Sequence, residues 1–180
     1  MIGSWQIQHL DTPSLCLELG LAHLDASINL CKDMEAGALP ETFHHAKVIM
    51  ALAYHGIELF LKYGIGRRNA GKCPGGHSLR QLQAEYESLN RDPNLHFIVP
   101  FIPAYLGFSA DDVKQKIQAE QPLDQHLRYH LDMKGSPWPE IHGFDVEAYV
   151  SEVTALRDTL RAISKKIEAT KPVQATRPGV

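Results

Sequence analysis

The last stretch of regular sequence constrains the fold more than any other part of the chain. Its apolar residues recur at steps of three and four without a break, at Val146, Tyr149, Val153, Leu156, Leu160, Ile163 and Ile167. An α-helix has about 3.6 residues per turn, so this spacing puts all of them on one helical face. Asp145 precedes the run and is a good helix-capping residue. The sequence therefore predicts a long amphipathic helix that packs against other helices.

Three earlier segments also have helical patterns. The first follows Asp11, with Thr12 as the expected cap and Pro13 in the first turn, where no amide donor is needed. Its predicted apolar face is Leu15, Leu19, Ala22, Ala26 and Leu30. The second is expected to begin near Glu41 and to end at Gly64 and Gly66, with Ala46, Ile49, Ala53, Ile57 and Phe60 on its apolar face.

The third segment begins at Ser78, where Gln81 completes a capping box. Between the second and third segments, residues 67–76 are rich in basic residues and glycine, so we expect a flexible basic loop there. The chain has no internal repeat and no alternating strand pattern of useful length. Periodicity thus predicts an all-α fold, an antiparallel helical bundle of four or five main helices.

Composition is that of an ordinary globular protein. The 180 residues are 44% apolar and 22% charged. This length predicts one domain, over residues 1–168, and the polar end of the chain with its two prolines predicts a disordered tail over 169–180. The net charge of -3 supplies no overall basic field for coating nucleic acid. The three cysteines form no close-paired motif, and no signal peptide or membrane-length apolar run is apparent. We expect a soluble cytoplasmic protein that has no membrane partner.

Three short segments in a fixed order resemble the HEPN family of small helical domains. They are the helical pair Glu58 and Lys62, the step His77-Ser78-Leu79 at a helix start, and Arg128-Tyr129 before the last helix. In HEPN domains an antiparallel bundle often carries equivalent residues late in the second helix, at the start of the third and before the last. The resemblance covers roughly residues 42–167 and implies a homodimer.

The family includes RNases, which are often toxins or defence proteins. They use an arginine followed four to six residues later by a histidine near the start of the last helix, paired across a dimer. Arg91 and His96 have this spacing and are the candidate catalytic residues of a metal-independent RNase. The histidine would move a proton and the arginine would stabilise charge on the scissile phosphate. However, Pro93, which breaks helices, lies between the two residues. The pair also follows the third helix instead of lying near the start of the last helix.

Other family members are non-catalytic and accompany nucleotidyltransferases or bind nucleotides and small ligands. On this interpretation the candidate ligand-binding residues are Glu58, Lys62, His77 and Arg128, with Arg67, Arg68 and Lys72 of the basic loop at the rim. The expected partners are a nucleotide or RNA ligand and a nucleotidyltransferase or antitoxin, and no cofactor is expected. Glu58 and Lys62 are also an ordinary i,i+4 helix-stabilising pair, with a contribution on the order of a few tenths of a kcal/mol.

The ten histidines leave a third interpretation open. His126 and His130 are four residues apart, and His45 on the second helix could supply a third ligand. DinB-like helical metalloproteins have a similar arrangement, in which three histidines leave a metal position open to water. The leading prediction is nevertheless a HEPN-like binding or accessory module without a metal, with the RNase and the metalloprotein as alternatives.

Overall fold

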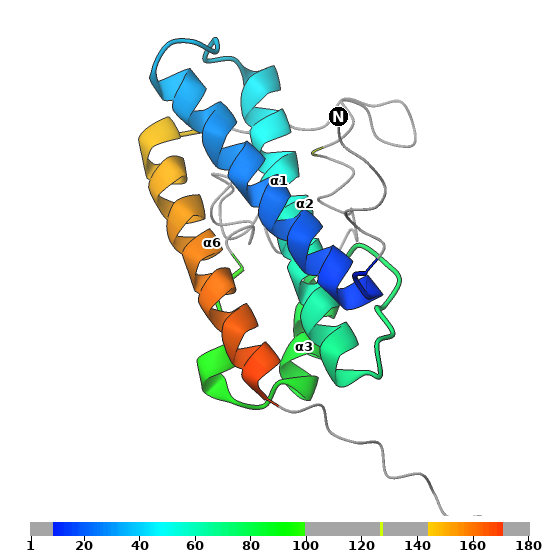
Figure 1. Ribbon diagram of the computed structural model, residues 1–180. Coiled ribbons are helices and arrows are strands. Elements are labelled where there is room, and N and C mark those ends of the chain that lie inside the picture. Colours follow the sequence, from blue (N-terminus) through cyan, green and yellow to red (C-terminus); the bar gives the residue numbers. More distant parts are fainter. Residues whose placement is uncertain (1–8, 100–126, 128–143, 171–180) are drawn as a thin grey trace, which may run out of the picture.

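The computed structural model describes residues 9–99, 127 and 144–170, and these residues form an all-helical bundle (Figure 1). Its helices are α1 (Thr12–Glu35), α2 (Phe43–Arg68), α3 (Leu79–Leu89) and α6 (Val146–Ala169), with a short 3-10 turn, η2 (Pro93–Leu95), after α3. Helix α1 runs antiparallel to both α2 and α6, and α3 packs on the C-terminal half of α2 (Figure 1). The predicted all-α bundle is therefore confirmed.

Short polar side chains begin the helices by accepting hydrogen bonds from free backbone amides. Two predicted caps are confirmed: Ser78 accepts from the amide of Gln81 at 3.4 Å, and Asp145 accepts from that of Ala148 at 3.0 Å. The predicted cap of α1 is wrong, because the Asp11 carboxylate, and not Thr12, accepts from the amide of Ser14 at 2.9 Å.

The buried face of α1 differs from the predicted one. Leu19 on the predicted face is 51% exposed. The buried positions are instead Pro13, Gly20, Leu24, Ser27, Ile28, Cys31 and Met34. Helices α1 and α2 cross where two glycines meet, since a Cβ atom added at Gly20 would lie 2.9 Å from the carbonyl oxygen of Gly56. The buried face of α1 therefore combines large apolar residues with small ones such as Gly20 and Ser27, which an apolar pattern alone does not include.

Helix α2 continues past the two glycines that were expected to end it. A Cβ atom at Gly64 would overlap the ring of Tyr86, so this glycine makes room for α3. At Gly66 a Cβ atom would lie 2.9 Å from both the Cys73 sulfur and Pro13 Cγ. Both glycines serve close packing within the helix, which ends at Arg68. Arg67 and Arg68 therefore belong to the last turn of α2 and not to the predicted loop.

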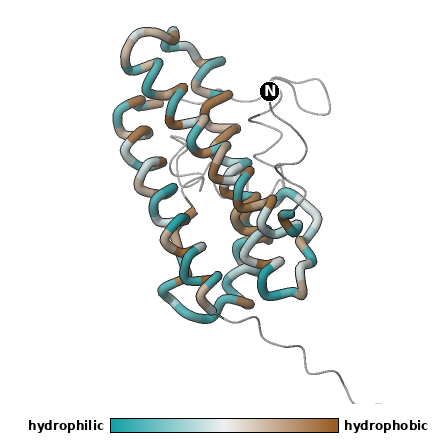
Figure 2. Tube along the Cα trace, viewed as in Figure 1, coloured by the Kyte–Doolittle hydropathy of each residue, from teal (hydrophilic) through white to brown (hydrophobic). Residues whose placement is uncertain are grey.

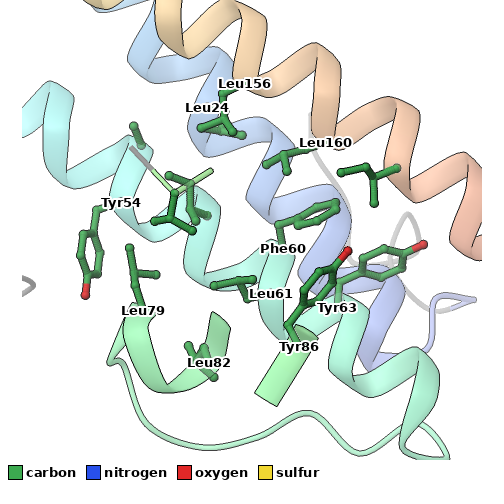
Figure 3. Close-up of a cluster of buried hydrophobic side chains, with 14 of the residues drawn as sticks. Leu24, Tyr54, Phe60, Leu61, Tyr63, Leu79, Leu82, Tyr86, Leu156 and Leu160 are labelled. Atoms are coloured by element: carbon green, nitrogen blue, oxygen red, sulfur yellow. The ribbon is translucent and has the colours of Figure 1, made fainter. Parts of the chain in front are cut away.

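The core forms around α2, which carries the most apolar residues of the bundle. Helix α6, in contrast, is amphipathic, with apolar and polar residues interleaved along its length (Figure 2). Phe60 lies at its centre among side chains from α1, α3 and α6, including Leu24, Tyr86 and Leu160 (Figure 3). Its ring lies edge-to-face with that of Phe97, with 5.5 Å between the ring centroids. By length and composition α2 could also cross a membrane, but 67% of its apolar window is buried in the bundle, as in a core helix.

Candidate functional site

A buried carboxylate on α2 is the centre of the candidate site. The side chain of Glu58 has no exposed surface. Three basic side chains contact it: Lys62 Nζ lies 2.8 Å from Oε1, His77 Nδ1 lies 3.0 Å from Oε1, and His55 Nδ1 lies 3.4 Å from Oε2. The structure thus brings together three of the four predicted ligand-binding residues. The fourth, Arg128, lies outside the described residues.

Two separate segments supply these side chains. His55, Glu58 and Lys62 are spaced by three and four residues, so they lie on one face of α2. His77 comes from the segment between α2 and α3, immediately after Gly76, whose φ of 80° is open to glycine but strained for most other residues. The Tyr54 hydroxyl donates a hydrogen bond of 3.0 Å to the His77 carbonyl oxygen and so fixes that backbone against α2.

The surroundings of Glu58 keep it ionised. Burial acts to raise the pKa of this carboxyl, but hydrogen bonds from His55 and Lys62, the charge of Lys62 and a hydrogen bond from His77 outweigh it and lower the pKa to about 2. An ionised carboxylate only accepts hydrogen bonds. The Nδ1 atoms of His55 and His77 must therefore carry the hydrogens that face Glu58. The Nε2 atom of each neutral ring is left unprotonated.

The partners of Glu58 lie between the carboxylate and solvent. The side chains of His77 and His55 are 57% and 37% exposed, and that of Lys62 is 13% exposed. A fourth basic side chain adjoins them, because the His23 ring on α1 lies edge-on to that of His55 with 4.8 Å between centroids. A buried anion thus orients two partly exposed imidazoles and one largely buried lysine side chain. We call His55, Glu58, Lys62 and His77 the Glu58 cluster.

His55 is the member of the cluster that sequence reasoning missed. It stands three residues before Glu58, so the three-and-four spacing that pairs Glu58 with Lys62 would also have indicated His55. The HEPN resemblance includes Lys62 and His77 but not His55.

The two arginines that were expected at the rim have structural contacts. Arg67 binds Asp11 at 2.8 Å and Glu168 at 2.9 Å, which ties the C-terminal turn of α2 to the start of α1 and the end of α6. The Nε atom of Arg68 donates to the side-chain oxygen of Asn90 at 3.1 Å. Their guanidinium groups therefore join helices and turns, and a role for them at the rim of a ligand site stays a prediction.

The candidate catalytic pair Arg91 and His96 lies around η2, between α3 and the segment leading to Val99. His96 Nε2 lies 2.7 Å from the carbonyl oxygen of Asn90, so this nitrogen carries a hydrogen and donates it to the backbone. Arg91 is exposed in the preceding turn. Neither residue belongs to α6, where the family pattern has its arginine and histidine.

Of the three histidines of the metalloprotein alternative, only His45 lies in the described residues. Its Nδ1 atom lies 2.8 Å from the Thr42 hydroxyl in the first turn of α2. His126 and His130 lie outside the described residues. In the part of the chain that the structure describes, no group of three or more histidine, cysteine, aspartate or glutamate side chains is arranged to hold a metal ion.

Comparisons with known proteins found no match for this chain. No family model matches the chain, and neither a curated protein nor a solved structure matches it.

Proposed function

We propose that this protein is a HEPN-like binding or accessory module that takes a phosphate-bearing ligand, such as a nucleotide, at the Glu58 cluster. The observation that supports the proposal is the fully buried, ionised Glu58, whose partners Lys62, His55 and His77 are all basic.

Stability alone is a poor reason for this arrangement. Removing a carboxylate and an ammonium from water costs several kcal/mol per ion, and well-packed apolar residues at such positions are often at least as stable. Ionisable groups with strongly perturbed pKa values are concentrated at functional sites. Glu58 is completely buried, and the side chain of its ion-pair partner Lys62 is 13% exposed. The cost of burial is therefore consistent with a role in orienting Lys62 and His77.

The cluster has the donors that an anion needs. The ammonium of Lys62 has three hydrogens, and Glu58 accepts one of them. Each imidazole can add a proton at Nε2 while its Nδ1 atom still donates to Glu58. With both rings neutral the cluster has no net charge, and with both protonated its charge is +2. Protonated rings would therefore give the cluster the positive charge that attracts an anion.

Sulfate is a suitable first probe, because its charge stays constant between pH 5.5 and pH 8. We expect sulfate to shift the side-chain NMR signals of His55 and His77, and to bind at least about tenfold more tightly at pH 5.5 than at pH 8, since imidazoles change charge in this range. Adenosine monophosphate should compete with sulfate, whereas adenosine should not.

Variants test whether sulfate binds at the Glu58 cluster or to positive charge elsewhere on the surface. His77→Gln changes an exposed side chain outside the helices and is expected to weaken sulfate binding about tenfold or more; Lys62→Gln should do the same. The matched control is His44→Gln, an exposed histidine in the first turn of α2, which should bind like the wild type. Wild-type affinity in His77→Gln and Lys62→Gln, with circular dichroism showing folded protein, would refute the proposal.

A further inference from the structure

Two cysteines far apart in sequence meet beside the C-terminal end of α2. Cys16 lies on α1 and Cys73 lies in the segment between α2 and α3, with 3.9 Å between their sulfur atoms. Both thiols are free and half-buried. The third cysteine, Cys31, is fully buried in the core, and its thiol contacts the carbonyl oxygen of Val146 at 3.6 Å.

Local packing supports the meeting of these two thiols. Gly66 leaves the space that the Cys73 sulfur occupies, since a Cβ atom there would lie 2.9 Å from that sulfur. A disulfide bond is about 2.05 Å long, so the sulfur atoms must approach by about 2 Å. Cys73 belongs to a non-helical segment in which Gly71 and Gly76 have positive φ. This segment can move its backbone without disrupting a helix.

We propose that Cys16 and Cys73 form a reversible intramolecular disulfide when the protein meets a low-molecular-weight disulfide such as oxidised glutathione. One cysteine thiolate attacks a sulfur of glutathione disulfide, forms a mixed disulfide and releases one glutathione thiolate. The second cysteine thiolate then attacks the protein sulfur of that mixed disulfide and releases the second glutathione. The two cysteines are oxidised, the glutathione disulfide is reduced to two thiols, and those thiols take up the two protons.

The surroundings of Cys73 lower its reactivity in this exchange. Burial raises the pKa of its thiol to about 11, and the neighbouring Cys16 and Asp11 act in the same direction, against the charge of Lys62. Little of the reactive thiolate is present near neutral pH, so we expect slow oxidation that accelerates as pH rises. A thiol of high pKa is also a poor leaving group, so the disulfide should resist reduction once it has formed.

The disulfide would join α1 to the segment that carries His77 to Glu58. Its formation does not require that the Glu58 cluster binds anything. The test of the disulfide and the test of the proposed function are therefore independent.

The experiment is oxidation of the folded full-length chain with oxidised glutathione at pH 8.5, followed by peptide mapping. Cleavage after Glu18 separates Cys16 from Cys31 and so identifies the linked residue. We expect a monomer that has lost two hydrogens, a linked Cys16–Cys73 peptide pair, reversal by dithiothreitol and a rise in Tm of roughly 5–10 °C. Cys16→Ser should lose the cross-link and instead carry glutathione on Cys73.

Two results would overturn the inference. One is wild-type protein that accumulates glutathione adducts or intermolecular dimers without the Cys16–Cys73 peptide pair. The other is a cross-link that involves Cys31, which the folded structure buries completely. Peptide mapping on the wild type decides the matter even if a cysteine variant folds poorly.

Discussion

The pH dependence of stability should reveal the buried charge of Glu58. Its pKa falls from an ordinary 4.5 to about 2 in the folded protein. At about 1.4 kcal/mol for each tenfold change in proton affinity, this difference corresponds to about 3 kcal/mol. The folded pKa is the lower one, so the stabilisation is fully present above about pH 4.5. It is lost as pH falls through the folded pKa of about 2.

The perturbation is Glu58→Gln, which removes the charge and keeps the shape of the side chain. At pH 5 we expect the variant to be less stable than the wild type by about 3 kcal/mol, because Lys62 loses its charged partner. Between pH 5 and pH 3 about 2 kcal/mol of that difference should disappear, because the Glu58 carboxyl gains a proton in the unfolded wild-type chain, where its pKa is near 4.5, while the folded protein keeps it ionised.

Urea denaturation followed by circular dichroism at pH 5, 4 and 3 measures both free energies of unfolding. The matched control is Glu18→Gln, an exposed glutamate on α1, which should differ from the wild type by no more than about 0.5 kcal/mol at each pH. If the difference between wild type and Glu58→Gln stays constant from pH 5 to pH 3, the buried ionised carboxylate is not the source of the stabilisation.

Two further substitutions test the packing of the bundle by urea denaturation. Gly56→Ala puts a methyl group 2.8 Å from the carbonyl oxygen of Gly20 and should lower the free energy of unfolding by about 1–3 kcal/mol, because it pushes α1 away from α2. Its control is Gly75→Ala, where an added Cβ atom meets nothing within 4 Å. Equal stability of the two variants would contradict a tight crossing of α1 and α2. Tyr86→Phe removes the buried 2.8 Å hydrogen bond to the Leu95 carbonyl oxygen and should cost about 1–2 kcal/mol, whereas an unchanged free energy of unfolding would show that water satisfies that carbonyl.

Sequence patterns predicted those parts of the fold that depend on local spacing. The apolar stripe of α6 and the caps at Ser78 and Asp145 follow from residues within one or two helical turns. The buried face of α1 was predicted incorrectly, because Gly20 is buried there for its small size. The end of α2 was also misplaced, since Gly64 makes room for Tyr86 from a later helix, and a local pattern contains no information on that contact.

The candidate site also has one part that local spacing predicts and one part that depends on contacts between distant segments. The contact of Glu58 with Lys62 follows from helical spacing, and His55 obeys the same rule. The contact of His77 with Glu58 depends on the path of the chain after α2, including the positive φ of Gly76 and the hydrogen bond from Tyr54. Local spacing does not predict this path, whereas the HEPN resemblance includes His77.

The most direct test of the site is the hydrogen position on the His77 ring. Side-chain nitrogen NMR of the wild type at pH 7.5 distinguishes a ring protonated at Nδ1 from one protonated at Nε2. We predict the Nδ1–H form for His77, because Nδ1 lies 3.0 Å from the ionised Glu58, and a shift of the ring nitrogen signals when sulfate is added. An Nε2–H ring that sulfate leaves unchanged would mean that Glu58 does not orient His77 for ligand binding.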